Sequence, residues 1–387
     1  MKLKSNMKLQ IIAVNILMLL SCCQNNEVFQ NNAMLIDIDI SDMESFEFQN
    51  TYDSIVYIPL ENDPSSLISS VDKLYMTDSN FVVFDAKQML IFVFDKTGHF
   101  QNLLGTKGMG KNEYMYWNDV IFSPKDDLVY AHERYQNKIF IYDLSGRLIS
   151  ISKASKQMFN SFARSEHGYY IYSCFKKPFN PQGFNLMCLD EDLQESNASF
   201  FPQEEFVNVK SGSTFSLSAN GELYFYYPSS NVIYQLESDS VIPSYKLDFG
   251  KHTLPYNEIV HLSNTKAYEQ CVSNQGYVGD VNNWMRNQDW ISFEFSETDF
   301  NKPIKNYYCM YHLNEHKCYL DESPFIMTFD AFPISRKVVY MNNEGVIYLL
   351  YPFMLSENSL DLLSKQLRTS ITSESNPILV YCMFKKP

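Results

Sequence analysis

The sequence lacks two features that would assign it to common classes of protein. After residue 21 it has no apolar run approaching the roughly 20 residues that a membrane-spanning helix needs. It is also short of positive charge, because 31 Lys and Arg face 45 Asp and Glu and the net charge is −14. Binding to phosphates needs a basic surface, so the charge argues against a nucleic-acid partner.

Sequence signatures of catalysis are missing as well. The chain contains no Gly-x-Ser-x-Gly nucleophile motif and no His-Glu-x-x-His metal motif. Seven His and 45 carboxylates are too many for an acid–base pair to be chosen from sequence alone, so no catalytic residue is assigned. An active site built from distant parts of a chain leaves no local motif, and an enzyme is therefore not excluded.

Glycine (13) and proline (15) are scarce, whereas tyrosine (27) and phenylalanine (29) are abundant. Tyr and Phe favour strands, so we expect a β-rich domain with a sizeable core. Beyond Cys22 and Cys23, the six other cysteines are scattered and form no dense disulfide framework. Most are expected to be small buried apolar residues, and Cys309 with Cys318 is the pair to test for a bridge.

The N-terminus indicates export. Three lysines precede an apolar run from residue 9 to residue 20, which ends in Leu19-Leu20-Ser21-Cys22. A basic segment, a short apolar segment and a small residue before cysteine look like a bacterial lipoprotein signal. We predict a signal peptide over residues 1–21, a lipid on Cys22 and a linker over residues 22–51. An ordinary cleaved signal peptide is the alternative.

The lipid would define both the first partner and the location. Two or more acyl chains anchor a protein stably, so the membrane is the expected partner. The expected location is the outer membrane, on its periplasmic or cell-surface face.

An internal repeat organises the rest of the chain. The segment from Leu90 to Phe100 matches that from Lys138 to Leu148, and each copy has an apolar strand, an Asp-x-x-Gly turn and a second strand. Weaker copies follow, so that anchors at positions 95, 143, 190 and 237 lie 48, 47 and 47 residues apart. A fifth copy falls at residues 310–314, and a sixth unit ends with a strand at residues 378–384.

A period of about 40 to 50 residues with several strands per unit is typical of β-propeller blades. We predict an all-β fold, a six-bladed β-propeller over residues 52–387. It should have a short, partly helical insertion at residues 254–287 in the fifth blade and a short helix near residues 360–367. An N-terminal strand at residues 54–60 should close the ring by pairing within the last blade. Two β-sandwiches are the alternative architecture.

Three segments carry a resemblance to a known family. They are Tyr57-Ile58-Pro59-Leu60-Glu61, Phe94-Asp95-x-x-Gly98 and the loop from Gly105 to Tyr114. The chain resembles the six-bladed β-propeller lipoproteins of Bacteroidota, which are relatives of the NHL-repeat propellers. In the loop, Gly108, Gly110, Glu113 and Tyr114 match the family pattern, whereas Lys111 and Asn112 replace Pro and Gly. The resemblance implies the fold and an envelope location, and it defines no activity.

Two motifs resemble ligand sites without completing them. The run Gly105-x-x-x-x-Gly110-Lys111 has Asn112 where a phosphate-binding loop needs Ser or Thr, so a glycine-rich link between blades is favoured. The run Cys309-x-x-His312-x-x-x-His316-x-Cys318 has metal-ligand residue types. On a strand, however, residues three apart point to opposite faces. No metal and no cofactor are therefore predicted.

Candidate ligand-binding residues come from the insertion and from two loops. Loops on a rigid scaffold often carry function, and aromatic rings beside polar groups suit a sugar or a peptide. Burial in the insertion's own core is the alternative for these rings. The candidates are Tyr256, Tyr277, Trp284, Arg286 and Trp290, with Glu113, Tyr114 and Arg134.

The sequence favours a binding or interaction module at the cell envelope, with a glycan, a peptide or an envelope protein as its partner. The alternative is a glycan-active hydrolase or lyase with acid and base residues at the propeller channel. A structural subunit of a membrane complex is a third possibility.

Overall fold

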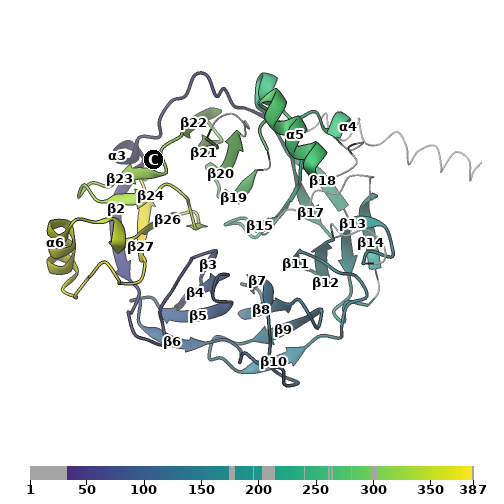
Figure 1. The fold of residues 1–387 in the computed structure, drawn as a ribbon, viewed down its shortest axis with the longest axis horizontal. Coiled ribbons are helices and arrows are strands. Elements are labelled where there is room, and N and C mark those ends of the chain that lie inside the picture. Colours follow the sequence, from purple (N-terminus) through teal and green to yellow (C-terminus); the bar gives the residue numbers. More distant parts are fainter. Residues whose placement is uncertain are drawn as a thin grey trace, which may run out of the picture.

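The computed structural model describes residues 33–173, 179–194, 196–202, 214–238, 240–259, 262, 265–279, 281–297 and 303–385. Six antiparallel sheets surround a central axis and form a six-bladed β-propeller (Figure 1). The predicted fold class is confirmed.

The first three blades each consist of four consecutive strands, which follow one another from the axis outward. Blade one contains β3 (Lys73–Met76), β4 (Asn80–Asp85), β5 (Leu90–Asp95) and β6 (Phe100–Leu103). Blade two contains β7 (Trp117–Ser123), β8 (Leu128–Glu133), β9 (Lys138–Tyr142) and β10 (Leu148–Ile151). Blade three contains β11 (Ser161–Ser165), β12 (Gly168–Tyr172), β13 (Phe184–Leu189) and β14 (Ser196–Pro202).

Blades four and five also contain four consecutive strands each, whereas blade six takes strands from both ends of the chain. Blade four contains β15 (Phe215–Leu217), β16 (Leu223–Tyr227), β17 (Val232–Glu237) and β18 (Ser240–Asp248). Blade five contains β19 (Asn282–Arg286), β20 (Trp290–Glu297), β21 (Lys305–His312) and β22 (Lys317–Asp321). Blade six contains β25 (Tyr340–Met341), β26 (Gly345–Leu350), β27 (Ile378–Phe384) and, outermost, β2 (Tyr52–Pro59).

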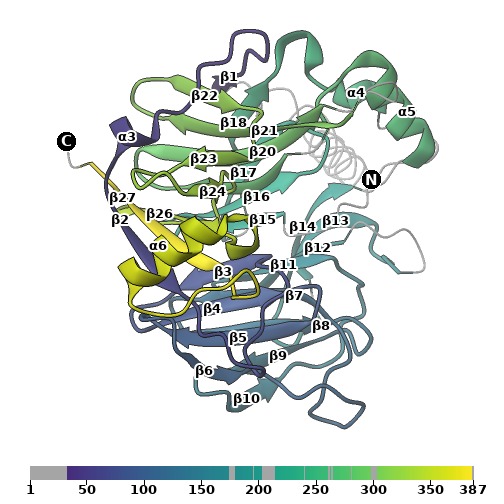
Figure 2. The same cartoon turned by 60° about the vertical axis from the view of Figure 1, so that its left-hand side comes forward.

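The strand β2 closes the ring as predicted. It pairs antiparallel with β27, with Tyr57 opposite Val380, and so joins the two ends of the propeller (Figure 2). The segment that follows the closing strand contacts blade one, because Glu61 N donates to Gly98 O at 2.8 Å. Gly98 has a φ of 92°, and a Cβ there would lie 2.1 Å from the carbonyl oxygen of Pro59. Glycine is therefore required where the closing strand passes.

The repeated Asp-x-x-Gly turns have the same geometry in blades one and two. Asp95 Oδ1 accepts hydrogen bonds from the backbone N–H groups of Thr97 and His99, at 2.8 and 3.0 Å. Asp143 Oδ1 accepts the corresponding bonds from Ser145 and Arg147, both at 3.0 Å. Each turn joins the third and fourth strands of its blade, which explains the spacing of the repeat.

One buried apolar cluster lies between each pair of neighbouring blades. Successive side chains of a strand point to opposite faces, so each strand contributes to two clusters. In β4, for example, Val82 and Phe84 pack toward blade two, whereas Phe81 and Val83 pack toward blade six. Burial on both faces explains why the middle strands are almost entirely apolar.

The N-terminal segment enters the fold earlier than expected. Its described part contains β1 (Met34–Asp37), which pairs in parallel with β18, and the short helix α3 (Phe48–Thr51). Ile36 and Ile38 are buried in the cluster between blades four and five. The linker predicted over residues 22–51 is therefore, from Met34 onward, part of the propeller, because these side chains need a core to cover them.

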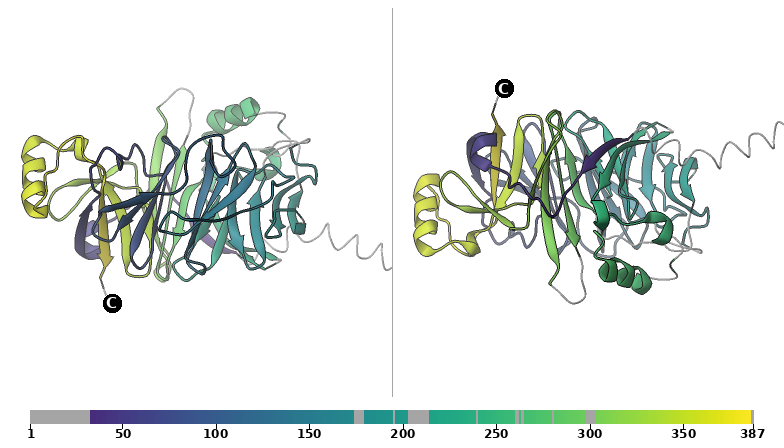
Figure 3. Two further views of the ribbon diagram at one scale, coloured as in Figure 1. Left: turned by 90° about the horizontal axis from the view of Figure 1, so that it is seen from below. Right: turned by 90° about the horizontal axis from the view of Figure 1, so that it is seen from above.

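The two faces of the ring differ. Because the strands of a blade alternate in direction, two kinds of connection lie on one face of the ring. These are the loops between blades and the loops that join the second strand of a blade to the third, and we call this face the loop face. The loop face carries α4 (Tyr256–Ile259) and α5 (Thr265–Gln275) before blade five, whereas α6 (Glu357–Leu367), between β26 and β27 of blade six, lies at the outer rim of the ring (Figure 3). The loop face also carries the hairpin of β23 (Phe325–Met327) and β24 (Pro333–Ser335). The opposite face, which we call the turn face, carries the short inner turns and the Asp-x-x-Gly turns.

Candidate functional site

The candidate site is the channel along the propeller axis. Its volume is about 1580 Å³, and all six innermost strands (β3, β7, β11, β15, β19 and β25) contribute to its wall. A pocket for a drug-sized ligand is typically about 300 to 1,000 Å³. The channel therefore has room for a ligand of several units, such as a short oligomer.

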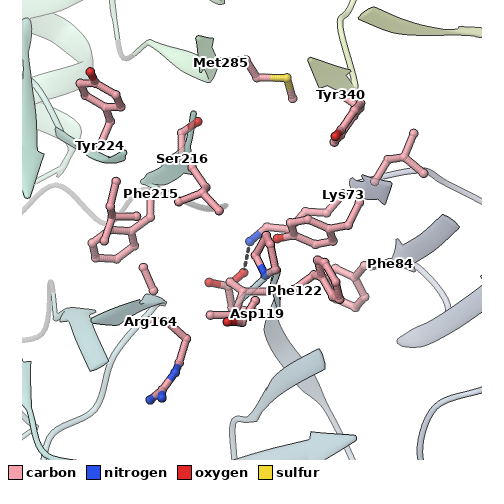
Figure 4. Close-up of a pocket in the computed structure, with 18 of the residues that line it drawn as sticks. Lys73, Phe84, Asp119, Phe122, Arg164, Phe215, Ser216, Tyr224, Met285 and Tyr340 are labelled. Carbon is pink, nitrogen blue, oxygen red and sulfur yellow. Dashed lines mark hydrogen bonds and ion pairs between the residues drawn. The ribbon is translucent and has the colours of Figure 1, made fainter. Parts of the chain in front are cut away.

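An ion pair between blades lies in the channel wall (Figure 4). Lys73 of blade one contacts Asp119 of blade two and also donates to Val120 O at 3.0 Å. The second carboxylate oxygen of Asp119 accepts the backbone N–H of Phe162, in blade three, at 3.1 Å. Burial lowers the pKa of Lys73, but Asp119 and Tyr75 outweigh it and raise the pKa overall. These contacts tie three inner strands together and occupy the carboxylate.

A second carboxyl group of the wall has a different environment. Glu294 on β20 accepts a hydrogen bond from Asn283 Nδ2 at 3.0 Å. Burial raises its pKa, and nearby Lys337 and the bond from Asn283 oppose the rise. Glu294 therefore holds a proton more readily than an exposed glutamate does.

Aromatic and apolar side chains line much of the remaining wall. Phe215 and Ser216 come from β15, Met285 from β19 and Tyr340 from β25, and all lie around the cavity (Figure 4). These three short strands belong to three different blades. Sequence reasoning missed these four residues because positions from distant repeats form no local motif.

The segment His132-Glu133-Arg134 ends β8 at the loop-face mouth of the channel. Arg134 follows the strand, lines the channel and is exposed. His132 is fully buried and stacks on Phe159, with ring centres 3.8 Å apart. Burial lowers the pKa of His132 to about 3, so the ring is neutral at neutral pH.

Glu113 and Tyr114 serve the glycine-rich loop. Glu113 Oε2 accepts the backbone N–H of Gly110 at 2.7 Å. Tyr114 is 1 % exposed and stacks on Trp117 with ring centres 4.0 Å apart. The loop has no helix after it, and both residues stabilise the link between blades one and two.

The two tyrosines expected to bind ligand in the insertion pack inside it. Tyr277 packs against the insertion's own core, which contains Leu254, Tyr268 and Val272. Tyr256 packs between that core and the cluster of blades three and four, 6.1 Å from the ring of Tyr227. Both side chains therefore follow the alternative given for these rings, burial in the insertion's own core.

Of the other three predicted residues, Trp284 and Arg286 both lie on β19 and contact the ring of Tyr245, whereas Trp290 lies apart from them. Trp284 is the only one of the three in the channel wall, and it is 7 % exposed. Arg286 pairs with Glu222 of blade four. Trp290 lies in the cluster between blades five and six, with His312 4.5 Å from its ring. The eight predicted ligand-binding residues therefore do not converge, and only Trp284 and Arg134 line the channel.

The metal-type residues of blade five also separate. Cys309 faces the cluster toward blade four, whereas His312 contacts Trp290 on the other side of the sheet. Among the described residues, no group of three or more His, Cys, Asp or Glu side chains could hold a metal ion. Cys309 Sγ lies 3.3 Å from Cys318 Sγ, and burial raises the pKa of the Cys309 thiol.

The predicted signal peptide and Cys22 lie outside the described residues. Within the part of the chain that is described, none of the helices combines the length and the apolar character that crossing a membrane requires.

Six sheets around a wide, lined channel define the class of protein, a six-bladed β-propeller with a channel along its axis. The chain belongs to the family described as a domain of unknown function, DUF4934, whose model matches residues 34–383. No curated protein matches it.

Two solved structures share the fold over nearly their whole length. One is a protein from Bacteroides fragilis NCTC 9343 named for its expected export, with a TM-score of 0.73 and 14% identity. The matched region covers 91% of this chain and 100% of the Bacteroides fragilis chain. The other is a DUF4221 family member from Bacteroides vulgatus ATCC 8482, with a TM-score of 0.56, 12% identity and coverage of 87% and 99%. The resemblance to propellers of Bacteroidota is confirmed.

Proposed function

We propose that the protein is a ligand-binding module of the cell envelope and that its ligand occupies the axial channel. The observation that carries the proposal is the channel itself, about 1580 Å³ in volume and walled by six inner strands. Aromatic rings, amides and charged groups alternate along this wall, and such a mixture suits a short glycan or a peptide.

A glycan-active enzyme with the same channel is less well supported. Such an enzyme needs an acid and a base that both face the substrate. Asp119 is held by Lys73 and by the backbone of blade three, and His132 is buried and neutral. Glu294, with its raised pKa, is the carboxyl group with the environment of a general acid. Binding therefore needs fewer assumptions than catalysis.

The envelope location rests on two observations. The sequence begins with a lipoprotein-type signal ending at Cys22, and the similar Bacteroides fragilis propeller is named for export. The variant Cys22→Ala should move the protein from the membrane fraction to the soluble fraction of cells that process lipoproteins. Continued retention on membranes would contradict the lipid anchor.

Ligand binding is tested by obstructing the channel. Ser216→Trp places an indole in the channel wall, whereas Ser150→Trp places the same group on the exposed outer strand β10. Ligands found by glycan and peptide arrays with the wild-type protein should lose affinity for the first variant and keep it for the second. Equal affinity for both variants, with both folded by circular dichroism, would exclude the channel. Turnover of a bound glycan would favour the enzyme.

A further inference from the structure

A corner of two tyrosines and one arginine lies at the loop-face mouth of the channel. Tyr116 precedes β7, and Arg134 and Tyr135 follow β8. The two rings lie 6.2 Å apart and nearly perpendicular, at 82°. The guanidinium carbon of Arg134 lies 5.9 Å from the centre of the Tyr116 ring. Tyr116 and Arg134 line the channel, and Tyr135 is 69 % exposed beside them.

A buried carboxylate holds this corner in place. Glu133 is 0 % exposed, and its carboxylate accepts backbone N–H groups from Tyr116 at 3.1 Å and from Gln136 at 2.5 Å. Arg134 N also donates to Tyr116 O at 3.0 Å. Burying a carboxylate is costly unless hydrogen bonds replace water. Glu133 therefore fixes both loop segments, and the corner is ordered before any ligand arrives.

The charges at the two mouths of the channel differ. On the turn face the wall contains Asp78, Asp126, Asp127 and Glu166 against Lys125 and Arg164. Arg164 is already paired, with Glu191 at 2.8 Å. At the loop face the wall contains Asp72, Asp119 and Glu294 against Lys73, Lys337 and Arg134, so the charges there balance. Lys73 is paired with Asp119, whereas Arg134 forms no ion pair with any residue that the structure describes. An anionic group is therefore repelled at the turn face and can be accepted at the loop face.

We propose that Tyr116, Arg134 and Tyr135 bind a carboxylate-bearing sugar, a uronic acid unit of a glycan whose remainder occupies the channel. This inference rests on the proposed function. A tyrosine ring can cover the C–H face of a pyranose, and guanidinium binds a carboxylate through two parallel N–H bonds. Two rings beside one guanidinium match a flat ring that carries its carboxylate at the edge. An acidic peptide would use the arginine but would leave the exposed face of the Tyr135 ring uncovered.

The test compares two forms of one saccharide by calorimetric titration of the full chain. Trigalacturonate carries the carboxylates, and its methyl ester has the same rings without the charge. The acid should bind at least about tenfold more tightly than the ester, as expected for a charge-assisted hydrogen bond. Added salt should weaken binding of the acid.

Variants then locate the contact. Arg134→Ala and Tyr135→Ala should each weaken binding of the acid by about tenfold, and Arg134→Lys by less, because lysine keeps the charge without the two-pronged geometry. Arg147→Ala is the matched control, since it removes one exposed arginine from the turn face. It should leave the affinity unchanged.

Several results would overturn the inference. They are absence of binding by the acid, equal binding of acid and ester, or an Arg134→Ala variant with wild-type affinity. Binding of a polyglutamate peptide in place of trigalacturonate would exclude the sugar. If Ser216→Trp still abolishes binding of an array ligand in any of these cases, the corner is refuted and the channel function stands.

Discussion

His132 is a buried histidine whose hydrogen bonds select the neutral ring. Nε2 lies 3.0 Å from Asn137 Oδ1, and Nδ1 lies 3.3 Å from Asn118 Nδ2. The amide of Asn137 donates to two backbone carbonyls, and that of Asn118 donates to Asn160 O, so both amides have a fixed orientation. Nε2 therefore donates and Nδ1 accepts. Protonation of Nδ1 would set a new N–H against an amide that also donates.

The consequence is a loss of stability in acid. Burial lowers the pKa of His132 in the folded protein from 6.5 to about 3. Between these values the unfolded chain binds a proton that the folded protein does not, so the free energy of unfolding falls as the pH falls. The slope is about 1.4 kcal/mol per pH unit once the pH is well below 6.5. At about pH 5 the accumulated loss is about 2 kcal/mol.

The loss of stability can be measured by unfolding the wild type and His132→Gln in urea at about pH 7.5 and at about pH 5. Glutamine stays neutral, so the stability advantage of the wild type should shrink by about 2 kcal/mol between the two pH values. Both proteins contain the same carboxylates, so the effect of carboxylate protonation on stability cancels when the two proteins are compared. His167→Gln, which removes an imidazole whose side chain is 79% exposed, is the control. A constant difference between wild type and His132→Gln would refute the buried, neutral histidine.

Two further predictions concern the closing strand and the cysteine pair. Gly98 and Gly146 have similar φ values of 92° and 88°, but only a Cβ on Gly98 would meet backbone closely, at 2.1 Å from Pro59 O. Gly98→Ala should therefore destabilise the fold by about 1 to 3 kcal/mol more than Gly146→Ala in urea unfolding, and equal losses would argue against the clash. Cys309 and Cys318, with sulfurs 3.3 Å apart, should form a disulfide by exchange with oxidised glutathione. Alkylation and mass spectrometry would detect it, and two alkylated thiols after this treatment would contradict the prediction.

The fold could be predicted because each blade repeats the same local physics. Asp95 and Asp143 organise identical turns, and the apolar strands around them bury both faces. The spare strand β2 was recognisable because a ring with an unpaired apolar strand at one end must close. The predicted start of the propeller at residue 52 missed β1. This strand is short, and its parallel partner lies about two hundred residues away in the sequence, so no local pattern marks it.

The site could not be predicted in the same way. The channel wall takes one short strand from each blade, so Lys73, Asp119 and Tyr340 meet only after the ring has closed. Composition does not separate a tyrosine that stacks on a ligand from one that fills a core. Tyr277 and Trp290 have the residue types of a binding site, yet neighbouring blades or helices cover them. Arg134 could be named as a candidate from the sequence because the end of a blade strand lies near the mouth whatever the other blades contribute.

The division of the propeller into two faces indicates where function can change without loss of the fold. The turn face consists of short turns whose Asp and Gly residues are engaged in backbone geometry, and the helices α4 and α5 on the loop face and α6 at the rim are additions to the blade pattern. Between the faces, the contacts of Lys73, Asp119 and Phe162 hold the inner strands together. Substitutions on the turn face should therefore alter stability first. Those at the loop-face mouth, where Arg134 and Tyr135 are exposed on a loop held by Glu133, should alter binding first.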